Sequence, residues 1–219
     1  PSSDGQFWHG NRSPNMWIDG VFMMQMFLIR CGQYVGETDY CYNTACRNVI
    51  TAARHLQRPD GLVLHAWTTE PEKATWADKQ TGLSPEVWSE GMGWYTLVVP
   101  ELLAVLPETH PDYNKILDIY IKMCRGLKSV QDKSTGGWFM VVDKGDNPLN
   151  FIDPSGTAMF VYSLRKGINL GLLKQKEYMP VVTKGYESLR PFIQVNEQGL
   201  LDVIGACDGA VSYTHLRAH

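Results

Sequence analysis

The sequence predicts an all-α protein that forms part of an (α/α)₆ toroid, a ring of repeated helix hairpins. Three polar turns with glycine, at residues 58–65, 132–140 and 196–203, each lead into a short apolar run. Two helical stretches precede each turn, so that a hairpin recurs roughly every 60–80 residues, as in repeat architectures. Hairpins of this kind stack because each leaves an apolar face uncovered. Three of them would make half of a ring of six.

Six helices are expected, in three consecutive pairs. They span about residues 18–33, 38–57, 85–106, 111–131, 154–170 and 174–194. Ser84 before Pro85 and Asp153 before Pro154 are typical of a helix start, because the first residue caps the helix and proline suits its first position. The second helix of each pair is more polar than the first, which indicates an inner and an outer layer.

The two ends of the chain suggest a fragment of a longer gene. The chain begins at Pro1 and shows no signal peptide, and residues 211–219 resemble translated read-through of a sequencing adapter. One domain is therefore expected over residues 1–210, followed by a non-native tail.

The composition excludes several classes of protein. With 44% apolar and 20% charged residues it is typical of a soluble globular protein, and it leaves cytoplasm and periplasm equally open. A net charge of −3 without a basic run argues against a nucleic-acid partner, and no apolar stretch is long enough for a membrane span. The five cysteines lack paired spacing, which favours scattered buried thiols over a metal site or a disulfide framework.

A single carboxylate stands between a tryptophan and a glycine, just before the first apolar helical run. The segment reads Trp17-Ile18-Asp19-Gly20. Aromatic rings stack on the C–H faces of sugars, and carboxylates bind the hydroxyls or donate a proton, so the segment fits a sugar subsite. It fits a helix cap equally well, because aspartate is a common N-cap residue.

Aromatic and acidic residues interleave again between the second and third expected helices. Residues 65–95 hold four of the seven tryptophans, on loops over a helical frame, which is typical of carbohydrate recognition. Trp67 and Trp76 are expected to face a ligand. Trp88 and Trp94 are six residues apart and do not share a helix face, so at most one of them is expected to point fully inward.

Taken in order, these segments resemble glycoside hydrolase family 105, the unsaturated rhamnogalacturonyl hydrolases. The matching motifs are WIDG at 17–20, GLVLHAW at 61–67, WAD at 76–78, SPEVW at 84–88, GMGWY at 91–95 and SGTA at 155–158. The resemblance extends over about residues 7–210. Each motif alone is weak, but so many in family order form a specific pattern.

The resemblance implies an (α/α)₆ toroid that removes a terminal 4,5-unsaturated galacturonyl residue from pectin-derived oligosaccharides. An acid protonates C4 of the enol ether, water adds at C5, and the resulting hemiketal opens and expels the rest of the sugar. This chemistry needs one carboxyl group that donates a proton and then helps to activate water. It needs neither a nucleophile nor a metal, so no cofactor is expected, and the expected partner is an oligosaccharide substrate.

By motif position, Asp19 corresponds to one of the family's two functional aspartates and is the expected catalytic residue. The substrate contacts expected around it are Trp17, His65, Trp67, Thr68, Trp76 and Trp94.

The sequence departs from the family at the second aspartate, which follows His-Ala-Trp in other members. Here the position is Thr68, whose hydroxyl is no useful acid near neutral pH. Three interpretations follow: Asp19 supplies the proton itself, a nearby carboxylate (Glu70, Asp78 or Glu90) does so, or the protein binds sugar without turnover. A different toroid enzyme, such as a sugar epimerase, would require histidine acid/base pairs that this chain does not show.

Overall fold

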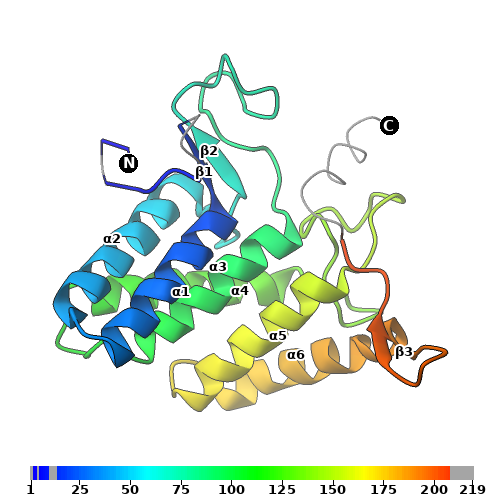
Figure 1. The fold of residues 1–219 in the computed structure, drawn as a ribbon. Helices are drawn as coiled ribbons and strands as arrows, with labels where there is room; N and C mark the ends of the chain where they lie inside the picture. Colours follow the sequence, from blue (N-terminus) through cyan, green and yellow to red (C-terminus); the bar gives the residue numbers. More distant parts are fainter. Residues whose placement is uncertain (1, 4, 10–13, 208–219) are drawn as a thin grey trace.

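The computed structural model describes residues 2–3, 5–9 and 14–207, and these contain three helix hairpins (Figure 1). The expected tail at residues 211–219 lies outside the described residues. The helices are α1 (Ile18–Tyr34), α2 (Thr38–Leu56), α3 (Ser89–Leu103), α4 (Tyr113–Ser129), α5 (Pro154–Asn169) and α6 (Gln175–Ser188). The all-α fold class is thus confirmed, and the described residues form an open arc of hairpins rather than a closed ring.

The helices lie in the two layers that the sequence predicts. In the inner layer α3 packs between α1 and α5, and in the outer layer α2, α4 and α6 each pack against the preceding inner helix. Among the described residues, no helix is long and apolar enough to cross a membrane.

Two buried tyrosines form hydrogen bonds between the inner and the outer layer. The hydroxyl of Tyr95 on α3 donates to the backbone oxygen of Val49 on α2, at 2.7 Å, and that of Tyr120 on α4 donates to Ser163 on α5, also at 2.7 Å. Both side chains are fully buried. Each ring therefore contributes apolar area to the core while its polar end stays hydrogen-bonded.

The predicted glycine turns share a backbone conformation that favours glycine. Gly61, Gly136 and Gly199 have φ values of +91°, +84° and +76°. The first two also meet neighbouring backbone, since a Cβ on Gly61 would lie 2.0 Å from the carbonyl oxygen of Lys122 on α4. The first two turns thus let the chain approach the following hairpin closely.

Gly61→Ala is expected to destabilise the protein by about 3 kcal/mol, because it combines backbone strain with a clash against α4. The matched control is Gly199→Ala, which has a similar positive φ but no heavy atom within 4 Å of the added Cβ. That control is expected to cost only about 1 kcal/mol. Urea unfolding of both variants measures the difference, and equal losses would contradict the role of the close approach.

The predicted start of the third helix at Ser84 and Pro85 is wrong, because α3 begins at Ser89. Ser84 instead pairs with the loop that follows the first turn: its backbone N–H donates to Ala66 O at 2.9 Å, and its hydroxyl oxygen accepts from Ala66 N–H at 3.2 Å. A tertiary backbone pairing thus takes the place of the local cap.

The predicted cap at Asp153 is confirmed. Its carboxylate accepts hydrogen bonds from the backbone N–H groups of Ser155 and Gly156, each at 3.1 Å. The last helix is shorter than expected: α6 ends at Ser188, and a 3₁₀ turn (Arg190–Phe192) containing Pro191 leads into β3 (Ile193–Val195), which pairs with β4 (Leu201–Val203).

Candidate active site

The three inner helices begin with a carboxylate at the same end of the molecule. Asp19 lies in the first turn of α1, Glu90 lies in the first turn of α3, and Asp153 caps α5. The inner helices run in the same direction, so their N-termini lie next to one another (Figure 1). Since a helix N-terminus carries a partial positive charge, it favours negative groups there.

A short antiparallel pair of strands joins two of the motifs that carry the family resemblance, WIDG and GLVLHAW. In β1 (Asn15–Trp17) and β2 (Ala66–Thr68), Trp17 lies opposite Ala66 and Asn15 lies opposite Thr68. The pairing continues into α1, because Ile18 N–H donates to the backbone oxygen of His65 at 2.9 Å. The structure therefore brings Asp19 beside the His-Ala-Trp loop.

Aromatic rings surround this junction. The ring centroid of Trp17 is 5.4 Å from that of His65 and 5.2 Å from that of Trp76. Trp17 and Trp76 are half-buried, whereas His65 is only 3% exposed. Trp67, also half-buried, stacks on His55 with the ring centroids 3.9 Å apart. The partly exposed indoles offer apolar surface to a ligand, and the buried imidazole of His65 packs against Trp17.

The two tryptophans around the start of α3 differ as expected. Trp88 is buried and lies edge-on to His65, with the ring centroids 6.2 Å apart. Trp94 is half-buried, and its ring centroid lies 4.7 Å from that of Phe22 on α1. Only Trp88 points fully inward, so Trp94 keeps a partly exposed surface.

The environment of Asp19 favours its protonated form. Its Oδ1 atom is buried and accepts no hydrogen bond within the described part of the chain. Burial raises the pKa of Asp19, while the charge of His9 and the backbone N–H groups of Asp19 and Gly20 oppose that rise. A carboxyl group with a raised pKa retains the proton that a general acid needs.

The pKa of Glu90 is also raised. Burial, followed by the negative charges of Asp153 and Asp19, raises the pKa of Glu90. The Asp153 carboxylate, in contrast, is held by five donors: the backbone N–H groups of Ser155, Gly156 and Cys207 and the hydroxyls of Ser89 and Ser155. Asp19 and Glu90 are therefore the two carboxyl groups at this end that are suited to donate a proton.

The other carboxylates near the loop are engaged elsewhere. The hydroxyl of Thr81, its backbone N–H and that of Gln80 all donate to Asp78 and lower its pKa. Glu70 forms an ion pair with Lys73 at 3.0 Å. Asp78 is therefore poorly suited to donate a proton, and the Glu70 carboxylate is engaged by Lys73.

Thr68 occupies a structural position in the loop. Its side chain is 2% exposed, and its hydroxyl donates to Pro14 O at 3.2 Å and accepts from Glu70 N–H at 3.1 Å. The loop itself thus uses this hydroxyl, and its contact with a sugar stays a prediction.

A cavity of about 410 Å³ opens beside this loop. Its lining consists of Pro14, Asn15, Thr68, Glu70, Lys73, Ala74, Thr75 and Trp76. It adjoins the aromatic junction and offers room for a sugar ring next to Trp76.

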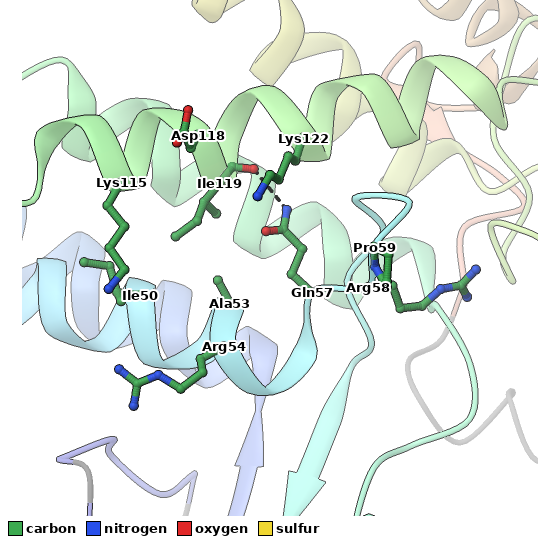
Figure 2. Close-up of a pocket in the computed structure, with 10 residues that line it drawn as sticks. All are labelled: Ile50, Ala53, Arg54, Gln57, Arg58, Pro59, Lys115, Asp118, Ile119 and Lys122. Carbon is green, nitrogen blue, oxygen red and sulfur yellow. Dashed lines mark hydrogen bonds between the residues drawn. The ribbon is translucent and has the colours of Figure 1, made fainter.

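Figure 2 shows another cavity, of about 450 Å³, between α2 and α4. Gln57 crosses it and donates to Ile119 O at 3.0 Å. The lining includes four basic side chains but none of the residues predicted to bind substrate. This cavity belongs to the outer layer and is separate from the candidate active site.

Sequence reasoning missed His9, whose charge acts on Asp19. His9 lies so close to α1 that a Cβ on Gly20 would be 2.8 Å from its Nδ1 atom. The glycine of the WIDG motif therefore makes room for this imidazole, and no sequence signal links the two residues.

Comparison with known proteins identifies the family. The model of Glycosyl Hydrolase Family 88 matches residues 1–215. The solved structure of a family 105 glycoside hydrolase from C. acetobutylicum is similar, with a TM-score of 0.87, 29% identity, and coverage of 95% of this chain and 58% of that chain. The present chain thus spans little more than half the length of that enzyme.

Two curated relatives are similar to parts of this chain. Protein Atu3128 of Agrobacterium fabrum is 26% identical over 185 residues, covering 82% of this chain and 77% of that protein. An unsaturated 3S-rhamnoglycuronyl hydrolase of Alteromonas sp. is 32% identical over 108 residues, which is 48% of this chain and 25% of the relative. Since the family model spans nearly the whole sequence and the solved relative shares its fold, this chain belongs to Glycosyl Hydrolase Family 88.

Proposed function

We propose that the protein hydrolyses oligosaccharides that end in a 4,5-unsaturated uronyl sugar and releases that sugar. Family membership and the 32% identical segment of the Alteromonas enzyme support this class of substrate. The observation that carries the proposal is the position of Asp19: its carboxyl group has a buried oxygen that accepts no hydrogen bond from a described residue, and it lies beside Trp17 and the His-Ala-Trp loop. The finer substrate within this class is a galacturonyl oligosaccharide derived from pectin.

In the proposed reaction, Asp19 in its protonated form donates its proton to C4 of the enol ether. Water adds to C5, and the Asp19 carboxylate takes up the proton that this water loses. The product at C5 is a hemiketal, which opens and expels the remaining sugar. Asp19 ends the cycle protonated, so no further acid is consumed.

The aromatic residues are proposed to hold the sugar ring. Trp17 and Trp76 present partly exposed indole faces on one side of the junction, and Trp94 presents one on α3. Trp67 stacks on His55 and lies 6.0 Å from Trp8 between ring centroids, so only the surface that these two rings leave free is proposed to contact the sugar. The buried His65 is proposed to position Trp17.

The test is an assay of the purified protein with an unsaturated galacturonyl disaccharide. Loss of the ultraviolet absorbance of the C4–C5 double bond, together with release of a reducing sugar, is the expected result. A parallel assay with an unsaturated glucuronyl disaccharide decides the finer substrate. Faster turnover of the glucuronyl compound would contradict the galacturonyl assignment but keep the reaction.

A second function, sugar binding without turnover, is favoured by Thr68, which stands where the family resemblance expects an aspartate. Isothermal titration calorimetry beside the absorbance assay separates the two. Binding of the disaccharide with no loss of the double bond would support the second function and overturn the first.

The raised pKa of Asp19 also has a consequence for stability. A raised folded-state pKa means that the stabilising contribution of this group is fully present below its ordinary pKa of 3.8 and is lost as the pH rises through the folded-state pKa. Asp19→Asn mimics the protonated form at every pH. The variant is therefore expected to match the wild type near pH 3 and to melt at a higher temperature at pH 7. A lower melting temperature at pH 7 would contradict the raised pKa.

A further inference from the structure

A second cluster of chemically reactive side chains lies in the outer layer, away from the candidate active site. Cys46 on α2 meets His110 and Asp112, which stand in the loop that leads into α4. Each residue offers one ligand atom: Cys46 a sulfur, His110 an imidazole nitrogen and Asp112 a carboxylate oxygen. These three atoms lie within 4.8 Å of one another. These are three different types of metal ligand, brought together from two separate parts of the chain.

Two of the three groups are used neither by a disulfide nor by the helix cap in the described structure. The side chain of Cys46 is 0% exposed, and its thiol is not part of a disulfide. Asp112 occupies the N-cap position of α4, but its carboxylate caps none of the helix N–H groups. A buried sulfur and a carboxylate without a cap hydrogen bond thus lie within 4.8 Å of each other.

The third group, the imidazole of His110, is hydrogen-bonded at both ring nitrogens, and binding a metal through Nδ1 would replace the hydrogen bond from Asp112 N–H. The backbone N–H of Asp112 donates to His110 Nδ1 at 3.1 Å, so this nitrogen carries the lone pair and the proton is on Nε2. The Nε2–H then donates to Asn43 Oδ1 at 3.1 Å. A hydrogen bond of this kind to the non-ligating nitrogen is typical of histidines that bind metals.

We propose that Cys46, His110 and Asp112 form a zinc site, with water as the fourth ligand. A thiolate, an imidazole and a carboxylate together suit Zn²⁺, whereas Mg²⁺ and Ca²⁺ prefer sites made only of oxygen ligands. In a tetrahedral zinc site the ligand atoms lie about 3.2–3.7 Å apart, so the three side chains need to close by about 1 Å. Binding displaces the thiol proton of Cys46 to solvent. The ion would link α2 to the start of α4.

The test is titration of the untagged, chelator-treated protein with CoCl₂, a spectroscopic substitute for Zn²⁺, followed by displacement with ZnCl₂. The expected result is one equivalent of Co²⁺ with a thiolate-to-metal charge-transfer band and the visible bands of tetrahedral cobalt. Zinc should abolish both, and zinc binding to the metal-free protein should release about one proton. A cobalt spectrum without a thiolate band would overturn the proposal.

Variants assign the ligands. Cys46→Ser is expected to lose the charge-transfer band, and His110→Ala and Asp112→Asn are expected to weaken zinc binding about 100-fold or more. The matched control is Cys41→Ser, which replaces another buried free cysteine of the same helix and should keep the full spectrum. If Cys46→Ser does not fold, the His110→Ala and Asp112→Asn variants test the site instead, because both of these side chains are half-buried. Wild-type affinity in both of those variants would also overturn the site.

Discussion

Asp19→Asn is expected to lower kcat for the unsaturated uronyl disaccharide by a factor of about 10²–10⁴, the usual contribution of a general acid. The amide has nearly the shape of the protonated carboxyl group but has no acidic proton to give to C4. Substrate affinity should change little, because the aromatic residues around Trp17 remain in place. Absorbance of the double bond measures turnover, and calorimetry measures binding to the inactive variant.

Glu90→Gln provides the matched comparison, because Glu90 is the other carboxyl group at this end whose pKa is raised by burial. Its kcat is expected to fall less than about 10-fold. The opposite pattern, an active Asp19→Asn and an inactive Glu90→Gln, would assign the proton transfer to Glu90. If both variants stay active, neither carboxyl group is the acid and the proposed mechanism fails.

Asp153→Ala is expected to destabilise the protein by about 2–4 kcal/mol. The Asp153 carboxylate is fully buried, caps α5 and accepts a hydrogen bond from the hydroxyl of Ser89 on α3. Its removal takes away the cap of one inner helix, unpairs buried donors and breaks the bond that joins two inner helices. Urea unfolding measures the loss.

Asp112→Ala, measured in the presence of a chelator, is the control for this effect. Both aspartates occupy an N-cap position, but Asp112 makes no cap hydrogen bond. Its replacement is therefore expected to cost less than about 1 kcal/mol. Equal destabilisation by the two variants would show that position, rather than hydrogen bonding, accounts for the cost.

The parts of the site that sequence reasoning anticipated are those that lie in continuous motifs. The WIDG and HAW segments could be identified because each is read within a few residues, and the resemblance orders them along the chain. Their contact through β1 and β2 is a tertiary fact. The preference among carboxylates also needed the structure, since Glu90 and Asp78 look alike in the sequence but have pKa values shifted in opposite directions.

By itself the sequence determined the repeated hairpins, the glycine turns and the family, because helical periodicity, positive φ at glycine and short motifs are local properties. Only the tertiary structure decided that Ser84 pairs with Ala66 instead of capping a helix, and that Cys46 lies beside His110 and Asp112. Both outcomes depend on contacts between segments far apart in the chain. The free energy of such contacts exceeds local preference, and no pattern within one segment encodes them.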